Sequence, residues 1–533
     1  MSDLLRMTGM YSGLDTASIV QELVSAKQTK VTNLKNEQKK LEWKQTAWQD
    51  LNSKIYNLYS NTLSDLRLTG SYTKKKTTSS DTTKVTVLAS DSAVNGTQTL
   101  KVNKLAKSGY LTGAKLDQGK TDENGKLVDW TTSDKLSEID SNLVGKKISI
   151  TVGTGDTAET KEIEITSDMT ITNFLGELKD AGVNASFDEG NQRFFISSTG
   201  SGAAKEFSIT DDNGALAALG LDTTATYANG TTATKIAAQD AEIVLNGATF
   251  TSDSNAFTIN GLTLNVTGET TEEISIVTTT DYDGIYETIK DFFSEYNELI
   301  NEIDKLYNAD SARKYDMLTD EEKEAMTDEE IEQWEDKIKS ALLRKDTTLS
   351  NVMNSMINMM MDGYLDTADL SEDEKNAMSA SEYAAWKKEH TKYLSSYGIN
   401  TLSYFEAEDN ERHAYHIDGD SEDESTSANA DKLKAAITED PEGTAEFFAN
   451  LCKTMYTKLG DLMARTEYSS IYKVYNDKQM QTEYDDYTTK IKEAEDELSD
   501  YEDKWYDKFT AMETALAKLQ SNSSAVTSML GTS

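Results

Sequence analysis

Apolar side chains recur every three or four residues along the last part of the chain, and this stripe constrains the fold more than any other feature. At about 1.5 Å per residue the stripe is about 60 Å long, too long and too narrow for a helix buried in a globular core. Such a helix needs partner helices. The stripe consists of Met480, Tyr484, Tyr487, Ile491, Ala494, Leu498, Tyr501, Trp505, Phe509, Met512, Leu516 and Leu519.

The first 69 residues carry a similar stripe, which is typical of a coiled-coil seam with polar interruptions at Lys27, Gln38 and Gln45. Residues 1–110 hold 16 Lys and Arg against 9 Asp and Glu, whereas residues 471–533 hold 7 against 13. Opposite charge would favour association of the two ends over pairing of like with like, and the alternative is that both charge runs are solvated faces. We expect the chain ends to meet because both carry an apolar stripe that needs to be buried. The stripe consists of Val20, Val24, Lys27, Val31, Leu34, Gln38, Leu41, Gln45, Trp48, Leu51, Ile55 and Leu58.

Composition excludes several classes of function. The 533 residues include 53 Lys and Arg against 93 Asp and Glu, a net charge of −40, which disfavours nucleic acids and anionic membrane surfaces as partners. No apolar run approaches the roughly 18 residues that span a bilayer, so we expect no membrane insertion. Residues 1–21 lack the apolar core of a signal peptide, so the protein either stays in the cytoplasm or leaves by another route.

The middle of the chain, from about residue 71 to 280, is rich in Thr, Ser, Gly and Asn and predicts a β-rich region. Asn246-Gly247 and Asn260-Gly261 are typical hairpin turns. One helix is expected at about 171–181. Alternating β-branched runs predict strands at 84–89, 98–106, 147–152, 161–165, 193–198, 205–210, 241–246 and 262–266.

Helical patterns return after Asp281 and include an internal duplication. Residues 318–334 align without gaps on residues 370–386, with seven of 17 positions identical. Each copy contains two capping boxes and therefore predicts two short helices. We expect Trp334 and Trp386 to pack the copies onto the main helices.

Candidate sites for chemistry are few. His413, His416 and Asp418 could ligate a metal, but three such residues in one loop often occur by chance. The acidic run at 418–424 lacks the glycine spacing of a calcium loop and predicts a solvated loop. Cys452, the single cysteine, lies in an apolar run and predicts an inert buried thiol. We therefore expect no enzyme, metal or cofactor, but an assembly protein with helical legs and a β-rich head.

The segment SGLDTASIVQELV at residues 12–24 resembles the opening of the bacterial flagellar filament cap family, hook-associated protein 2. Residues 171–198 resemble the short repeat of flagellins and their relatives. Residues 240–264, the signatures at 346–350, 398–401 and 417–418, and the terminal helix at 491–530 agree in order with the same family. The duplicated helices at 309–392 and the acidic loop at 419–430 depart from its pattern.

The resemblance implies a homo-oligomeric ring, commonly five-fold, at the distal tip of the flagellum outside the cell. The subunits would be exported unfolded through the flagellar type III channel with an export chaperone, and the ring would retain exported flagellin and direct it into the filament. Two alternatives stay open: a tip adhesin that binds host mucin or glycans, and a hook–filament junction protein. A secreted enzyme is disfavoured by the His and Cys counts.

The expected fold is a multidomain α+β chain, in which long terminal coiled-coil-like helices and a helical bundle carry a β-rich two-domain head. The expected divisions are legs at 1–40 and 471–533, poorly ordered when isolated; a bundle at 41–70 and 281–470; a β-rich head domain at 71–112 and 236–280; and an outer one at 113–235, with the flagellin-type repeat at 161–211. Residues expected to contact neighbouring subunits or flagellin are Leu14, Ile19, Val20, Leu23, Leu34, Leu41, Ile491, Leu498, Tyr501, Trp505, Phe509, Met512, Leu516 and Leu519.

Overall fold

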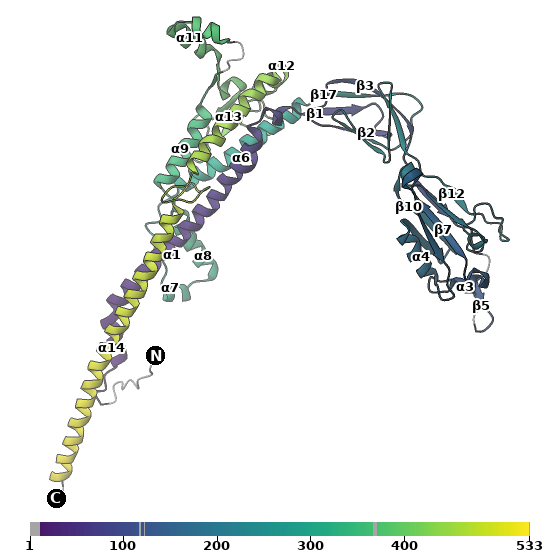
Figure 1. The fold of residues 1–533 in the computed structure, drawn as a ribbon. Helices are drawn as coiled ribbons and strands as arrows, with labels where there is room; N and C mark the ends of the chain where they lie inside the picture. Colours follow the sequence, from purple (N-terminus) through teal and green to yellow (C-terminus); the bar gives the residue numbers. More distant parts are fainter. Residues whose placement is uncertain (1–10, 117–118, 122, 366–369, 532–533) are drawn as a thin grey trace. The chain divides into compact units, whose positions relative to one another are not determined.

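Two long helices from opposite ends of the chain run side by side in the helical unit, which comprises the residues up to Tyr72 and from Tyr282 onward (Figure 1). The computed structural model describes residues 11–116, 119–121, 123–365 and 370–531. Helix α1 spans Thr16–Asn57 and helix α14 spans Asp477–Leu530. In the polar contacts between the two ends, the residue number on the α1 side increases while the residue number on the α14 side decreases. The two helices are therefore antiparallel. The prediction that the chain ends meet is confirmed.

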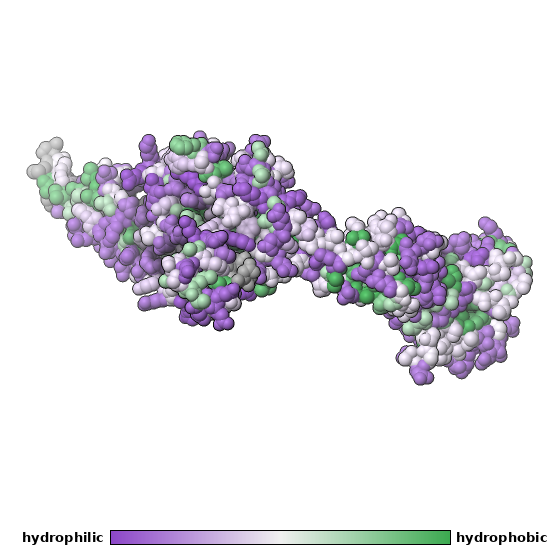
Figure 2. Space-filling view, turned by 90° about the horizontal axis from the view of Figure 1, so that it is seen from above, coloured by the Kyte–Doolittle hydropathy of each residue, from purple (hydrophilic) through white to green (hydrophobic). Residues whose placement is uncertain are grey.

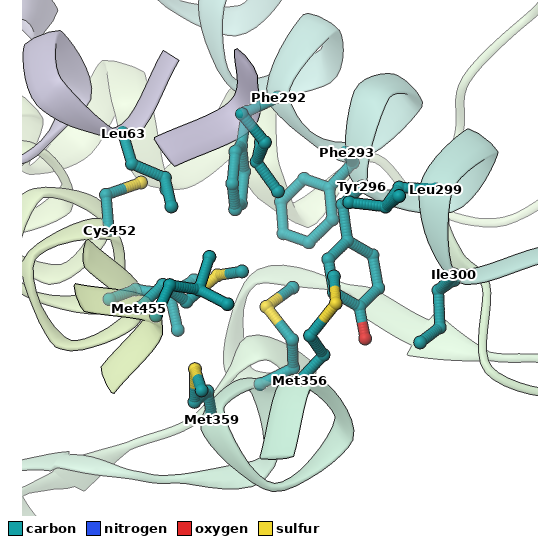
Figure 3. Packing of buried hydrophobic residues seen from close by; sticks show 14 of the residues in the cluster. Leu63, Phe292, Phe293, Tyr296, Leu299, Ile300, Met356, Met359, Cys452 and Met455 are labelled. Carbon is teal, nitrogen blue, oxygen red and sulfur yellow. The ribbon is translucent and has the colours of Figure 1, made fainter. Parts of the chain in front are cut away.

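The C-terminal part of α1 packs into a helical bundle, whose core is rich in aromatic residues and methionine. Figure 3 shows Phe292, Phe293 and Tyr296 of α6 facing Met356 of α9 and Met455 of α13. Flexible methionine side chains fill the irregular gaps between rigid rings, which suits a core built from helices of unequal length. The bundle helices are α6 (Tyr282–Tyr307), α9 (Thr347–Met361), α12 (Lys432–Glu439) and α13 (Pro441–Leu462).

Shorter elements complete the helical unit. A π-helical turn, η1 (Leu58–Leu63), follows α1 and keeps both Leu58 and Leu63 in the core. It leads to α2 (Ser64–Leu66) and the 3₁₀ turn η2 (Thr69–Tyr72); a further 3₁₀ turn, η6, covers Leu394–Tyr397. Two small antiparallel ladders join β18 (Tyr364–Leu365) to β19 (Thr391–Lys392), and β20 (Ile399–Thr401) to β21 (Tyr415–Ile417).

The duplicated segments form two helical pairs, as predicted. The first is α7 (Asp320–Glu324) with α8 (Asp328–Ser340), and the second is α10 (Glu372–Ala377) with α11 (Ala380–His390). All four predicted capping boxes are present. The expected role of the tryptophans was wrong: Trp334 packs edge-on against Tyr315, and Trp386 stacks on Tyr383 and His390 of its own helix. Each tryptophan ring is thus partly covered by residues close to it in the sequence rather than by one of the main helices.

The second unit, Thr73–Asp281, is β-rich and holds two separate hydrophobic cores. We call residues 73–107 and 237–281 the first β-region. Its two hairpin turns have positive φ at both central residues, 48° and 81° at Asn246-Gly247 and 46° and 80° at Asn260-Gly261, which confirms the predicted turns. Five strands pair in the order β1 (Lys75–Ser79), β17 (Ile274–Thr280), β3 (Gly96–Lys104), β13 (Ala241–Leu245), β14 (Ala248–Ser252), and three in the order β15 (Ala256–Ile259), β16 (Leu262–Val266), β2 (Val85–Ala89).

We call residues 108–236 the second β-region. Its strand β4 (Ser108–Thr112) pairs with β10 and β12, so residues 108–112 belong by pairing to this region rather than to the first. Helix α4 (Ile171–Asp180) confirms the predicted helix and covers the core with Phe174 and Leu178. The ladders are β12 (Thr234–Ile236), β4, β10 (Arg193–Ser201), β9 (Val183–Asp188); β11 (Phe207–Asp211), β7 (Lys147–Val152), β8 (Glu159–Glu164); and β5 (Lys120–Thr121) with β6 (Leu127–Val128). Short turns are α3 (Leu136–Ile139), η3 (Ser141–Leu143), η4 (Gly155–Thr157), η5 (Ala203–Lys205) and α5 (Ala215–Ala218).

All eight predicted strands are present, and the chain is a mixed α+β protein as expected. Strands β1, β4, β14, β15 and β17 were among those absent from the strand prediction. None of the described helices combines the length and the apolar character needed to span a bilayer.

Candidate functional site in the paired terminal helices

A latch joins the start of α1 to α14. The carboxylate of Glu513 accepts hydrogen bonds from the backbone N–H of Tyr11 at 2.8 Å, from that of Ser12 at 3.2 Å and from the Ser12 hydroxyl. The hydroxyl contact holds the pKa of Glu513 below its usual value. The next turn contains Gly13, at φ 70°, and Asp15, whose carboxylate caps α1 by accepting from the Ser18 N–H at 3.1 Å. One short segment therefore both starts α1 and fixes it to α14.

Ion pairs join the next part of the two helices. Glu497 of α14 lies 3.3 Å from Lys27 and 3.4 Å from Lys30 of α1, and Glu495 lies 2.6 Å from Lys35. The two lysines lower the pKa of Glu497 by hydrogen bonding and by their charge. These contacts agree with the opposite net charges of the two chain ends, although exposed pairs of this kind each contribute only about 0–1 kcal/mol.

Closer to the bundle, hydrogen bonds between uncharged groups join the two ends of the chain. The Gln38 amide donates to the Thr488 hydroxyl at 2.7 Å, so this polar interruption of the α1 stripe has a partner in α14. Nearer the bundle, the buried Asn52 donates to the carbonyl of Tyr472 at 3.1 Å and accepts from the N–H of Val474 at 2.9 Å. Asn52 thereby holds Tyr472 at φ 63°, an unusual conformation for a residue other than glycine, just before α14 begins.

The residues that the sequence indicated as contacts differ widely in burial. Only Val20 and Ile491 are buried between the helices. The half-buried ones are Ile19, Leu34, Leu41, Leu498, Tyr501, Trp505, Phe509, Met512 and Leu516, and the exposed ones are Leu14, Leu23 and Leu519. The pair thus covers most of these side chains only in part.

The far part of α14 carries an aromatic ladder. The Tyr501 and Trp505 rings lie 6.2 Å apart and the Trp505 and Phe509 rings 6.4 Å apart, while Lys27 of α1 lies over Tyr501. Beyond the latch, residues 514–530 extend α14 by about 25 Å. No hydrogen bond or ion pair joins them to the described part of α1, and Leu519 is 67% exposed. Figure 2 shows hydrophobic surface at this end of α14, at the left of the view.

Two family models match this chain, one over the part that contains α1 and the other over the part that contains most of α14. One, the N-terminus of flagellar hook-associated protein 2, matches residues 12–109, and the other, the C-terminus of that protein, matches residues 238–521. The second match alone covers more than half of the chain. The chain belongs to the flagellar hook-associated protein 2 family. The resemblance seen in the sequence is confirmed, and the family is one of structural proteins rather than of enzymes.

Named members of the family share a quarter or more of their matched residues with this chain. Flagellar hook-associated protein 2 of Halalkalibacterium halodurans is 25% identical over 376 residues, which are 66% of this chain and 68% of that protein. The Pseudomonas aeruginosa A-type protein is 26% identical over 321 residues, 56% of this chain and 63% of that protein. The Thermotoga maritima protein is 29% identical over 172 residues, 32% of this chain and 27% of that protein. This chain thus spans less than two thirds of the last two.

Solved structures of the family include the D1–D2–D3 domains of the flagellar cap protein FliD from Escherichia coli. That structure is 18% identical in sequence, has a TM-score of 0.48 and covers 83% of this chain and 99% of its own. The Escherichia coli D2–D3 domains alone are 23% identical, with a TM-score of 0.29, and cover 39% of this chain and 98% of theirs.

In this member of the hook-associated protein 2 family, sequence reasoning missed three residues of the paired helices. Ser12, Asp15 and Glu513 make the latch but lie outside the apolar stripes. Asp15 could have been found, because an Asp three residues before a Ser at the start of an apolar repeat is an N-cap signal. Glu513 could not, since its partner lies 501 residues away.

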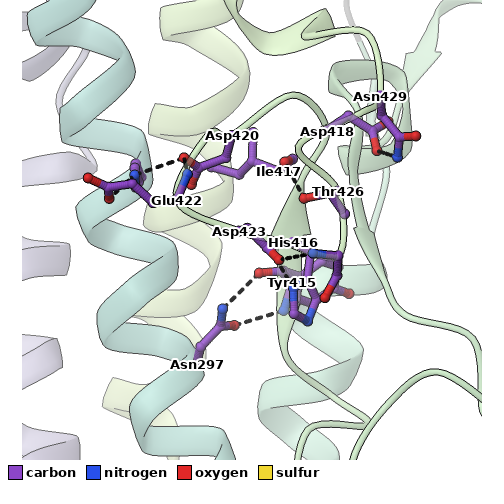
Figure 4. Close-up of polar contacts among 12 residues, drawn as sticks. Asn297, Tyr415, His416, Ile417, Asp418, Asp420, Glu422, Asp423, Thr426 and Asn429 are labelled. Atoms are coloured by element: carbon purple, nitrogen blue, oxygen red, sulfur yellow. Dashed lines mark hydrogen bonds and ion pairs between the residues drawn. The ribbon is translucent and has the colours of Figure 1, made fainter.

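The acidic loop that departs from the hook-associated protein 2 pattern is held by side chains (Figure 4). His416 Nδ1 lies 2.6 Å from Asp423, the Thr426 hydroxyl donates to the Ile417 carbonyl at 2.8 Å, and Lys290 lies 3.0 Å from Asp420. Burial alone would raise the pKa of Asp423, but hydrogen bonds from His416 and Ser425 lower it. The described residues contain no group of three or more His, Cys, Asp or Glu arranged to hold a metal, so His413, His416 and Asp418 form no such site there.

Cys452 is fully buried in the bundle core, 3.6 Å from the Tyr72 hydroxyl. Burial raises the pKa of its thiol to about 12. A thiol that stays protonated at neutral pH is a poor nucleophile, which agrees with the predicted inert core position.

Proposed function

We propose that this protein is a flagellar filament cap. Copies of the chain would form a ring, five-fold in its commonest form, at the distal tip of the flagellum outside the cell, where the ring retains exported flagellin and promotes its insertion. Residues 1–40 and 471–533 would act as legs, residues 41–70 and 281–470 as the bundle, and residues 71–280 as the head that forms the plate. Export through the flagellar type III channel with a chaperone belongs to the same proposal. Membership of the hook-associated protein 2 family supports it.

The observation that carries the proposal is the incomplete burial of the α14 stripe. Leu498, Trp505 and Phe509 lie on one face of α14 and stay half-buried in the pair with α1. Two helices cannot cover a wide apolar stripe, whereas a third helix from another subunit can. The indole N–H of Trp505 is covered by its own chain and has no acceptor among the described residues, so it is the exposed part of the ring that a partner would cover.

The part of α14 beyond the latch supports flagellin as one such partner. Leu516 and Leu519 continue the stripe there, yet no described residue of α1 bonds to this stretch. An amphipathic helix that projects past its partner is suited to lie along another helix at the end of a filament. Contact between legs and filament subunits would then form and break as each flagellin is added.

The first test deletes the gene and measures flagellin in the medium together with filaments on the cells. Abundant soluble flagellin with bare hooks is the result expected of a lost cap. Normal filaments without leakage would overturn the proposal.

A second test replaces both Leu498 and Trp505 with Asp in the full chain. We expect filaments to be lost while the β-rich unit stays folded, because a charge in the stripe is left unpaired when a partner helix covers it. The matched control is Ser499→Asp with Ala511→Asp, which adds the same charges at exposed positions of α14. Full-length filaments on cells with the first variant would show that the stripe is not the working contact.

A further inference from the structure

Two aromatic side chains project from the loop between β20 and β21. Phe405 is 96% exposed and Tyr404 is 68% exposed, with their rings edge to face at 5.7 Å. Arg412, at the far end of the loop, lies 4.6 Å from the Tyr404 ring and 2.8 Å from the Asp409 carboxylate. These contacts fix the loop in a form that presents Phe405 to solvent, where a large apolar side chain gains nothing unless a partner covers it. We call Tyr404 and Phe405 the knob.

A groove of about 560 Å³ lies on the same unit. Its apolar lining includes Ile357, Met360 and Met361, and Met361 is 64% exposed. Tyr296 also lines the groove; its side chain is buried and its hydroxyl has no hydrogen-bond partner within the described residues (Figure 3). The Tyr296 hydroxyl is covered by its own chain, so what the groove offers a partner is apolar surface, Met361 above all. We call this groove the socket.

Charge around the knob and the socket is complementary. Residues 403–411 contain four carboxylates and no Lys or Arg. Arg412 lines the socket and also a second hollow, of about 1060 Å³, whose other charged lining residues are Lys305, Lys314, Lys337, Glu302, Asp310 and Asp409. None of these three lysines has an ion pair within the described part of the chain. Glu302 is already paired with Lys54, and Asp409 with Arg412. The three lysines therefore leave the hollow with an excess of positive charge over Asp310, and this hollow beside an apolar socket suits an acidic loop that carries aromatic residues.

We propose that the knob of one copy docks into the socket of a second copy of this chain. Thr401 and Arg412, the two ends of the loop, both line the socket of their own chain, from which Phe405 points into solvent. The Phe405 ring would enter the neighbour's methionine-lined groove, and the loop carboxylates would face the neighbour's lysines. The contact joins unlike surfaces, so an open chain of copies keeps one free knob at one end and one free socket at the other until a ring closes. This inference rests on the proposed ring and names the surfaces that join its subunits.

The test uses two full-length variants, Phe405→Asp to break the knob and Met361→Asp to break the socket. Both positions are largely exposed, so each variant should fold, and circular dichroism melting checks this. Sedimentation is expected to show that each variant alone dissociates at concentrations where the wild-type chain is oligomeric, with its dissociation constant raised about 30-fold or more. An equimolar mixture should form dimers that do not grow further, because one intact knob meets one intact socket. Leu88→Asp, at an equally exposed leucine of the first β-region, is the control and should oligomerise like wild type.

Three results would overturn the inference. Oligomers of wild-type size from either single variant would remove the knob or the socket from the interface, whether the knob folds into its own socket or binds flagellin instead. A mixture that stays monomeric would exclude head-to-tail docking. A wild-type chain that is monomeric at every concentration would remove the proposed ring itself, which separates that failure from the first two.

Discussion

The α1–α14 pair contains two halves that share the same spacing of apolar residues but bury them differently. Near the bundle, Trp48 is 2% exposed, stacks on Tyr475 at 5.3 Å and joins the bundle core. Farther along, the pair buries small side chains such as Val31 and Ala494, while Trp505 and Phe509 remain half-buried. The repeat therefore specifies a helix with an apolar face, and the number of neighbouring helices decides how much of that face is covered.

The two halves also differ in what holds them together. Apolar packing and the buried Asn52 contacts fix the bundle half, whereas the far half depends on the Glu497 ion pairs and the Glu513 latch. Exposed ionic contacts contribute little to stability, while large buried side chains contribute several kcal/mol each. We expect the far half to open and close while the bundle stays folded.

The largest expected effect comes from a matched pair of phenylalanine substitutions. Phe293→Ala should lower the free energy of unfolding of the helical unit by about 3–5 kcal/mol, because it leaves a cavity in a fully packed core. Phe509→Ala, in the far half, should change it by less than about 0.5 kcal/mol. Urea unfolding followed by circular dichroism measures both, and equal losses would mean that the two halves form one cooperative core.

Thiol labelling sharpens the same comparison. Because its pKa is raised to about 12, buried Cys452 should react with a thiol reagent at pH 8 about 1,000-fold more slowly than a cysteine introduced by Leu519→Cys in a Cys452→Ala background. Reaction of both thiols in denaturant at the same rate is the control. Fast labelling of native Cys452 would contradict its place in a rigid core.

The smallest expected effect is a loosening of the far half in acid. The pKa values of Glu497 and Glu513 are lowered in the folded chain, so their contribution to pairing is present above the unfolded value of about 4.5 and is lost as the pH falls through the lower folded values. Distances between spin labels at Gln28→Cys and Asp500→Cys should broaden between pH 6 and about pH 3.5, while the near-ultraviolet signal of the bundle persists.

Glu497→Gln should weaken this pH dependence, because the side chain no longer titrates next to Lys27 and Lys30. A label distance that stays sharp at low pH would show that apolar contacts, not the carboxylates, hold the far half.

Much of the architecture could be predicted from local patterns. The apolar spacing predicted both terminal helices, the capping boxes predicted the four short helices, and the Asn-Gly pairs predicted two hairpins. Strand β1 was missed because its residues, Lys75–Ser79, include no apolar side chain and provide no period to read. Its place follows only from pairing with β17, about 200 residues later in the chain.

The candidate site was predicted less completely, and the reason is physical. Periodicity indicates which face of a helix is apolar but not how many helices cover it, so Ile491 and Leu519 looked equivalent although one is 8% and the other 67% exposed. The π-helical turn at Leu58–Leu63 likewise has no local sequence signal. Phe405 would be expected in a core from its side chain alone, and only the structure shows it facing solvent.

The latch between Ser12 and Glu513 is expected to close late in folding. The two residues are 501 positions apart, so their contact closes almost the whole chain into one loop. Contacts of such high sequence separation form late, after local helices and hairpins are complete. A polypeptide that ends before α14 begins at Asp477 would leave Val20, Val24 and Val31 of α1 uncovered and open to proteases or chaperones. The latch can therefore close only after α14 has been made as far as Glu513.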